Sequence, residues 1–174
     1  MNATSSEEFF FHFNSPLGLI TICYTDNPFM LAKVVLPGEK SSARCFGRSF
    51  RQPQGNSADR INGFMDAYFN KQSASVPWDL LKFEKFTLLQ RLVWKETAKI
   101  SFGKLCTYGA IAQAVGRPGA ARFAGTALGK NPYPIIIPCH RIIRKDGGMG
   151  GFGSGLEIKH KLLIHEGSIV ESFL

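Results

Sequence analysis

Short apolar runs near the start of the chain predict an antiparallel β-sheet. The runs are Phe9–Phe13, Leu19–Tyr24 and Phe29–Leu36, and clusters of Asn, Pro, Gly and Asp separate them. Aromatic and β-branched residues bounded by such clusters are typical of strands joined by turns. The next segment, residues 39–56, is rich in Gly, Ser, Gln and Arg and predicts a loop, with a short helix at Ser42–Phe46 as an option.

Helical spacing of apolar residues replaces this strand pattern farther along the chain. Ala58–Asn70 predicts one helix and Phe83–Ile100 predicts a longer, amphipathic one. Thr107 is a suitable N-cap for a short helix over Tyr108–Val115, and Ala120–Lys130 predicts another. Because a tight Gly-Arg-Pro-Gly turn joins the last two helices, they form a helix-turn-helix pattern.

A short apolar run then leads directly into three reactive side chains. Ile135–Ile137 predicts a buried strand, which Pro138 ends because proline has no N–H to donate. The residues that follow are Cys139, His140 and Arg141. A thiolate is a strong nucleophile, and nearby positive charge or a base promotes its formation. Extended neighbours point to opposite faces, so a bridging water or a turn is needed to connect the thiol to the imidazole. A buried structural cysteine is the alternative.

The end of the chain combines a glycine-rich loop with a last helix. Gly147–Gly155 lacks the Gly-Lys-Ser/Thr of a phosphate-binding loop, and its backbone, with Met149 and Phe152, suits the wall of a pocket for a flat ligand. Leu156–Glu166 predicts the helix. The carboxylate of Glu166 in the last turn opposes the helix dipole, and a residue that breaks a local rule in this way indicates a functional role.

Length and composition fit this organisation. The chain has 174 residues, of which 44% are hydrophobic, as expected for one globular domain or two small ones that share a core. The composition turns to Gly, Ala and basic residues near residue 80. We therefore predict an α/β fold of the α+β kind, with domains at residues 1–80 and 81–174.

Charge adds a candidate partner. The sequence has 21 Lys and Arg against 13 Asp and Glu, a net charge of +8, which favours a polyanion. The helix predicted over Ala120–Lys130 has many Ala and Gly residues, and small side chains let its backbone approach either another helix or DNA. Arg122 stands out from this face as in proteins that read the minor groove. We therefore favour DNA.

Several classes are not favoured by the sequence. The sequence contains no run of about 18 apolar residues, so it predicts no membrane span. The start of the chain also lacks a signal pattern. The four cysteines, Cys23, Cys45, Cys106 and Cys139, contain no CxxC pair, which argues against a disulfide framework and a zinc site. A reducing compartment, the cytoplasm or the nucleus, and no cofactor are expected.

The order of motifs in the second half resembles the O6-alkylguanine-DNA alkyltransferase family. The matching segments are Thr107-Tyr108-Gly109, Ala120-Ala121-Arg122, Asn131-Pro132-Tyr133-Pro134, Ile137-Pro138-Cys139-His140-Arg141 and His165-Glu166-Gly167. The Ile-Pro-Cys-His-Arg block is highly specific, whereas the first half is similar mainly through Ser15–Gly18. The resemblance implies an RNase H-like N-terminal domain and a helix-turn-helix of winged-helix type.

The resemblance also implies a monomeric repair protein that moves an alkyl group from O6-alkylguanine in double-stranded DNA onto Cys139, with O4-alkylthymine as a second lesion to consider. Glu166 then orients His140, which acts through a water on the thiol. Tyr108 assists the departing base, and Asn131 ties the helix-turn-helix to the cysteine. The remaining DNA-contact candidates are Thr107, Ala121, Arg122, Gly125, Lys130 and Arg141. The pocket candidates are Met149, Gly150, Phe152, Gly153 and Ser154. The base must be flipped out, because stacking hides its reacting atom.

The sequence departs from the family pattern at some positions, and other functions compete with alkyl transfer. Phe152 stands where the family often has Tyr, and Gly153 and Ser154 also differ from some members, which bears on substrate breadth. Metal ligands that some members carry are not evident. The competing hypotheses are a lesion-binding protein without transfer, a helix-turn-helix regulator with a buried cysteine, and a Cys–His hydrolase. The presence of a cysteine at position 139 argues against the lesion-binding protein.

Overall fold

A four-stranded sheet forms the first half of the protein. The computed structural model describes residues 7–38 and 48–170, so the helix considered at Ser42–Phe46 lies outside the described residues. The strands are β1 (Glu8–Ser15), β2 (Gly18–Thr25), β3 (Met30–Val35) and β4 (Ser49–Phe50), in the spatial order β3-β2-β1-β4. The β1–β2 and β2–β3 pairs are antiparallel, which confirms the predicted meander.

The fourth strand corrects the prediction of a purely antiparallel sheet followed by a loop over residues 39–56. β4 pairs with β1 in parallel, through Phe9↔Ser49 and Phe10↔Phe50. A two-residue strand has too little sequence to show a period of its own. It forms because β1 offers free backbone groups on that edge of the sheet.

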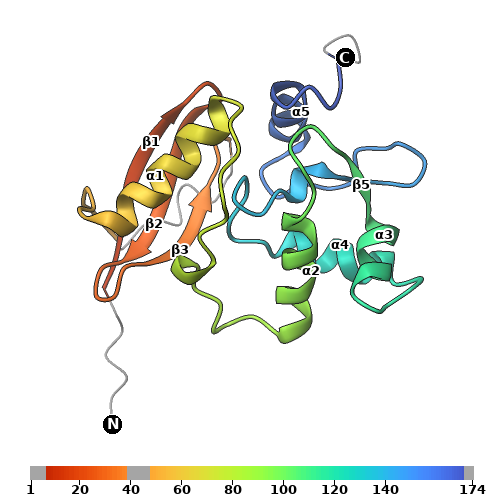
Figure 1. Ribbon diagram of the computed structural model, residues 1–174, viewed down its shortest axis with the longest axis horizontal. Helices are drawn as coiled ribbons and strands as arrows, with labels where there is room; N and C mark the ends of the chain where they lie inside the picture. Colours follow the sequence, from red (N-terminus) through yellow and green to blue (C-terminus); the bar gives the residue numbers. More distant parts are fainter. Residues whose placement is uncertain (1–6, 39–47, 171–174) are drawn as a thin grey trace.

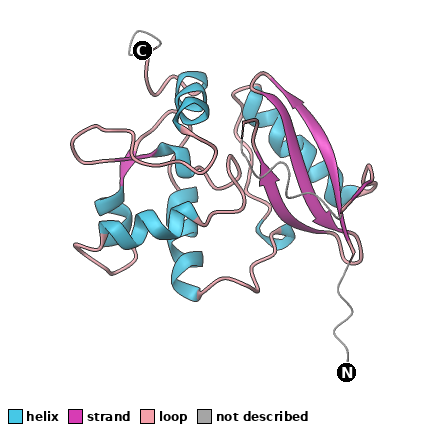
Figure 2. Ribbon diagram, turned by 180° about the vertical axis from the view of Figure 1, so that it is seen from behind, coloured by secondary structure: helices cyan, strands magenta, loops and turns pink. Residues whose placement is uncertain are grey.

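One helix covers the sheet. α1 (Asn56–Phe69) lies along one face of the strands, as Figures 1 and 2 show from opposite sides. Side chains on alternate residues of β1, including Phe9 and Phe11, are buried, and α1 contributes Ile61 and Met65 to the same core. Its end at Phe69 agrees with the predicted helix.

The second half of the chain is mainly helical. Its α-helices are α2 (Leu88–Ala98), α3 (Tyr108–Ala114), α4 (Ala121–Gly129) and α5 (Leu156–His165), and its short 3₁₀ turns are η2 (Trp78–Leu80) and η3 (Cys139–Arg141). Two short strands, β5 (Cys106–Thr107) and β6 (Ile142–Ile143), pair in parallel. In Figure 1 these elements gather beside the sheet. The predicted short helices, the turn between them and the last helix are all confirmed.

Two predictions in this half are wrong. The helix predicted from Phe83 begins only at Leu88, because Thr87 and Gln90 form a capping box there. The strand predicted at Ile135–Ile137 is a turn: Ile135 has φ of 74°, and the Ile137 N–H donates to the carbonyl of Tyr133 at 2.8 Å. The β-branched residues are buried as expected, but the Ile137 N–H bonds to a carbonyl four residues earlier and not to a neighbouring strand.

The edge strand β3 holds the two halves together. The Val34 N–H donates to the carbonyl of Pro132 at 2.8 Å. The buried hydroxyl of Tyr133 lies 2.9 Å from the carbonyl oxygen of Leu31 and 2.6 Å from that of Lys82. Buried side chains of both halves form one continuous cluster. The segment before Cys139 is therefore anchored on the sheet, while a domain boundary near residue 80 and the RNase H-like and winged-helix assignments stay predictions.

No helix in the described ranges is both long and apolar enough to cross a bilayer.

Candidate active site

Cys139 lines a cavity of about 910 Å³. The cavity walls come from α4, from the segment that follows it, from β3 and from the glycine-rich loop. Of the predicted site residues, those that line it are Tyr108, Ala121, Arg122, Gly125, Lys130, Asn131, Cys139, Gly150, Phe152, Gly153 and Ser154. The structure therefore brings together, around one thiol, residues that are up to 46 positions apart in the sequence, from Tyr108 to Ser154.

The 3₁₀ turn η3 separates the directions of the thiol and the imidazole. Pro138 precedes this turn, and the Arg141 N–H closes it by donating to the Pro138 carbonyl at 3.0 Å. Cys139 is half-buried and lines the cavity, whereas His140 is fully buried and does not line it. Within residues 7–38 and 48–170, no hydrogen bond joins the side chains of Cys139 and His140.

Asn131 ties the helix-turn-helix to the thiol. It follows directly on Lys130, the C-cap of α4. Its side-chain amide donates to the carbonyl of Ile137 at 2.9 Å and to Sγ of Cys139 at 3.1 Å. Its carbonyl oxygen accepts from the backbone N–H of Tyr133 at 3.0 Å. This geometry is the connection that the resemblance implied for Asn131.

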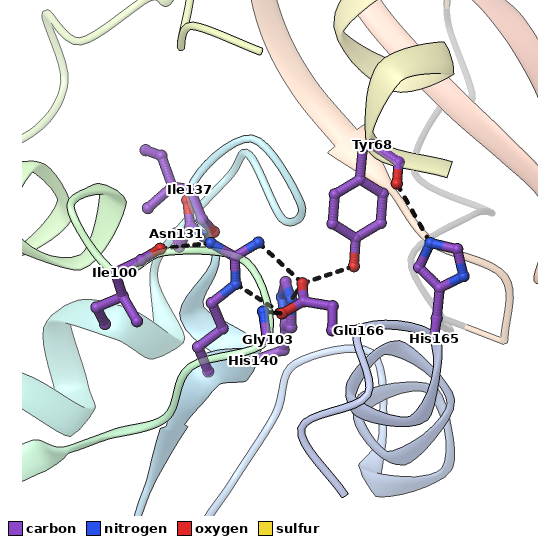
Figure 3. Close-up of polar contacts among 9 residues, drawn as sticks. Tyr68, Ile100, Gly103, Asn131, Ile137, His140, His165 and Glu166 are labelled. Atoms are coloured by element: carbon purple, nitrogen blue, oxygen red, sulfur yellow. Dashed lines mark hydrogen bonds and ion pairs between the residues drawn. The ribbon is translucent and has the colours of Figure 1, made fainter. Parts of the chain in front are cut away.

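Glu166 is the centre of a buried hydrogen-bond network, which Figure 3 shows. Its Oε1 accepts from the N–H on Nε2 of His140 at 2.6 Å, and its Oε2 accepts from the N–H of Gly103 at 3.2 Å. Tyr68 and Arg141 supply further donors to it. Burial raises the pKa of this carboxyl, but the hydrogen bonds from His140 and Arg141 outweigh burial and lower its pKa to about 2. Glu166 is therefore a carboxylate at neutral pH.

The backbone at Gly103 is adapted to this carboxylate. Its φ is 74°, a region that favours glycine, and a Cβ at this position would lie 3.0 Å from the backbone oxygen of Glu166. The segment before β5 can therefore approach the end of α5 closely enough to donate its N–H.

The pKa values of the two reactive groups are set mainly by burial. Burial raises the pKa of the Cys139 thiol, while the hydrogen bond from Asn131 and the positive charge of Lys159 oppose this effect. Burial lowers the pKa of His140, and the hydrogen bond to Glu166 opposes it. At neutral pH the site therefore holds a thiol and a neutral imidazole. The N–H on Nε2 is used by Glu166, so the lone pair is on Nδ1, which is buried without a hydrogen-bond partner among the described residues.

Arg141 lies apart from the other predicted DNA contacts. It is only 7% exposed, its guanidinium donates to Glu166 at 2.8 and 2.9 Å, and it donates to the carbonyl of Ile100 at 2.5 Å. A buried guanidinium with these partners stabilises the Glu166 carboxylate. The structure thus assigns Arg141 to the buried network, and the prediction that it contacts DNA is not supported.

Two further predicted residues lie outside the cavity lining. Thr107 caps α3, because its hydroxyl accepts from the Ala110 N–H at 3.2 Å. Met149 contributes its backbone carbonyl, which accepts a hydrogen bond from Lys159. Both residues support the cavity walls and do not form them.

Lys159 is a buried residue that the sequence reading missed. It is fully buried on α5, and its Nζ donates to the carbonyls of Ile142, at 2.5 Å, and Met149. Burial lowers its pKa to about 8, against an opposing effect of Cys139. Lys159 stands three and four residues before the buried Leu162 and Leu163, so helical spacing placed it on the inner face, which is the signal that could have found it.

The wall of the cavity opposite α4 is formed by backbone. Gly150 has φ of 68°, and a Cβ at this position would lie 2.5 Å from the Tyr108 hydroxyl. The same hydroxyl is 3.4 Å from the carbonyl of Gly151. Burial, and then the negative charge of a Cys139 thiolate, raise the pKa of Tyr108. The phenol therefore keeps its proton at neutral pH, and it lines the same cavity as Cys139.

The fold and the site define a helix-turn-helix domain with a cysteine in the lining of a cavity. Residues 88–168 match the family model described as "6-O-methylguanine DNA methyltransferase, DNA binding domain". These residues include every site residue named above except Tyr68. A methylated-DNA–protein-cysteine methyltransferase of Mycolicibacterium paratuberculosis is 34% identical over 161 residues, which are 88% of each chain. The chain belongs to the methylated-DNA–protein-cysteine methyltransferase family.

Other relatives match over shorter segments. The Shigella flexneri protein of the same name is 46% identical over 84 residues, 48% of this chain and 49% of that one. The chain thus spans about half the length of this relative. Among solved structures, Mycobacterium tuberculosis OGT in complex with DNA superimposes with a TM-score of 0.75 at 31% identity, covering 92% of this chain and 93% of that chain.

Proposed function

We propose that the protein repairs alkylated DNA by moving the alkyl group of O6-alkylguanine onto Sγ of Cys139. The observation that carries this proposal is the placement of the thiol. Cys139 lines a cavity beside the helix-turn-helix, while the next residue along the chain, His140, is buried and paired with Glu166 at 2.6 Å. The protein acts as a monomer on double-stranded DNA, and O4-alkylthymine presents a similar exocyclic oxygen.

The reaction begins with removal of the thiol proton. Because Nε2 of His140 is engaged by Glu166, Nδ1 accepts the proton through a bridging water. The amide of Asn131 stabilises the thiolate that forms. Sulfur then attacks the alkyl carbon, the carbon–oxygen bond breaks, and its electron pair stays on the guanine ring. Tyr108 donates a proton to that ring, so guanine leaves neutral, and the phenolate regains a proton through water from the His140 imidazolium.

The base reaches the thiol by rotation out of the helix through the minor groove. The small residues of α4 let its backbone lie close to DNA, and Arg122, which is exposed at the cavity rim, fills the space left by the flipped nucleotide. The thioether product is stable, and no described residue is placed to reverse it. Each molecule therefore reacts once.

The test is mass spectrometry after mixing the protein with duplex DNA that contains O6-methylguanine. We expect the mass of one methyl group on the peptide that holds Cys139, with at most one equivalent repaired per protein molecule. Cys139→Ala should give no adduct, and Cys106→Ala, which changes another half-buried free thiol, should react like the wild type. Binding without an adduct would favour the regulator or lesion-binding hypotheses, and repeated turnover would exclude the irreversible mechanism.

A further inference from the structure

Tyr68 connects the N-terminal half to the centre of the buried network. It is part of α1, 98 positions before Glu166, and its ring is 4% exposed. Its hydroxyl donates to Oε1 of Glu166 at 2.9 Å, as Figure 3 shows. The reaction described above uses Glu166 but gives no role to Tyr68.

The position of the Tyr68 side chain is fixed from several sides. Its backbone carbonyl lies 3.2 Å from Nε2 of His165, so consecutive residues at the end of α5 contact both ends of the tyrosine. Its ring centroid is 5.7 Å from that of Phe102 and 6.3 Å from that of His140, both in edge-on arrangements. The hydroxyl therefore has little freedom to leave the carboxylate.

The oxygen that Tyr68 contacts is the one that matters for His140. Oε1 accepts from Tyr68, from Nε2 of His140 and from Arg141, whereas Oε2 accepts from Arg141 and Gly103. A donor on Oε1 draws negative charge away from the imidazole. It thereby weakens the attraction that would keep a second proton on the ring.

The charged and titratable groups around this pair come from three elements. Arg141 approaches from η3, Lys159 and His165 belong to α5, and Tyr68 approaches from α1. Burial lowers the pKa of His140, Glu166 raises it, and Arg141 and Lys159 lower it further. Burial and the negative charge of Glu166 raise the pKa of Tyr68, so the phenol keeps its proton and remains a donor throughout the working range.

We propose that Tyr68 is a positioning residue for the alkyl transfer, through which the N-terminal half holds Glu166 in place and keeps His140 neutral and able to accept the thiol proton. This inference rests on the proposed function. It assigns to α1 a part in the chemistry, which otherwise lies entirely within residues 88–168 that match the family model.

The substitution Tyr68→Phe removes only the hydroxyl and leaves the ring in its packing. We expect transfer from O6-methylguanine DNA to be about tenfold slower at neutral pH, since one hydrogen bond to a charged group has an effect of this order. The acidic limb of the pH–rate profile should also move to higher pH, because Glu166 without this donor favours the imidazolium. A purely structural role for Tyr68 would not move that limb.

Tyr24→Phe is the matched control. Tyr24 is also buried, and its hydroxyl donates to the carbonyl of Arg51 at 2.9 Å, a residue outside the Glu166 network. It should lose a similar amount of stability and keep the wild-type rate and profile. Equal rates and profiles for Tyr68→Phe and Tyr24→Phe would overturn the inference, whereas a wild type without an adduct would overturn the proposed function itself.

A second replacement keeps the test independent of folding defects. Incorporation of 3-fluorotyrosine at position 68 makes the phenol a stronger donor and retains the hydrogen bond. The acidic limb should then move to lower pH, and the pKa of His140, followed by NMR on labelled protein without any DNA, should move in the same direction. No movement of the His140 pKa in either variant contradicts the inference.

Discussion

The side-chain amide of Asn131 donates to Sγ of Cys139 at 3.1 Å while it also donates to the carbonyl of Ile137 at 2.9 Å. One residue at the end of α4 thus fixes the turn before the cysteine and stabilises negative charge on its sulfur. This contact couples the helix proposed to face DNA to the sulfur proposed to accept the alkyl group. A shift of α4 on DNA binding would therefore move the Asn131 amide relative to the thiol.

Asn131→Ala is expected to raise the pKa of the Cys139 thiol, because the thiolate loses a hydrogen bond that stabilises its negative charge. The pH dependence of the rate of alkylation by iodoacetamide measures this pKa without DNA. Gln113→Ala removes an amide from the exposed face of α3 and serves as the control, for which no change is expected. An unchanged pKa in Asn131→Ala would remove Asn131 from the chemistry.

Gly150→Ala should destabilise the protein by about 1–3 kcal/mol, the typical cost of a non-glycine residue held at a left-handed backbone conformation. Its φ is 68°, and the new methyl group would meet the Tyr108 hydroxyl, so the phenol should also be displaced from its place in the cavity lining. At Gly151, by contrast, nothing lies within 4 Å of an added Cβ. Urea unfolding of Gly150→Ala beside Gly151→Ala checks this, and similar losses in the two variants would contradict it.

The pH dependence of stability should report on Glu166. Its pKa is lowered from 4.5 to about 2 in the fold, so the stability that its ionisation supplies is complete above about pH 4.5 and is lost as the pH falls toward 2. The difference of about two and a half units corresponds to about 3 kcal/mol. Chemical denaturation of the wild type and of Glu166→Gln at each pH isolates this contribution.

The gap in stability between these two proteins should be largest at neutral pH, where Glu166→Gln leaves the buried Arg141 without its carboxylate. It should close as the wild-type carboxyl is protonated. Glu157→Gln removes an exposed carboxylate from the same helix and should change stability little at any pH. A gap that stays constant from pH 7 to 2 would mean that Glu166 is not ionised in the fold.

Arg122→Ala is expected to slow transfer from duplex DNA by about tenfold or more, because unstacking a base costs a few kcal/mol that an inserted side chain helps to offset. Transfer from a free O6-alkylguanine base should be unchanged, since the thiol and its partners are untouched. Lys95→Ala, which removes one exposed positive charge from α2 outside the cavity, controls for net charge. Equal losses with duplex and free base would contradict the role of Arg122.

Sequence alone determined where a helix starts or ends when the capping residue lies within a few positions of that end. The hydroxyl of Thr107 accepts from a backbone N–H three positions later, so the start of α3 can be read from the sequence. The end of α5 is marked in the same way by Gly167, at φ of 69°. The sequence also placed a thiol directly after Pro138 and an ill-suited carboxylate at the end of a helix. The roles of these residues, however, came from the resemblance and not from their spacing.

Tertiary structure decided what depends on distant partners. The isoleucines Ile135–Ile137 have strand propensity but no strand beside them, so they form a turn, whereas Ser49–Phe50 pairs with β1 despite a weak pattern. Arg141 looks like a surface cation until Glu166 is placed beside it. The contributions of Tyr68 and Lys159 follow only from the packing of α1 and α5 around the site. Capping and turn formation depend on residues a few positions apart, but burial and hydrogen bonding to a single carboxylate depend on where the whole chain brings its donors.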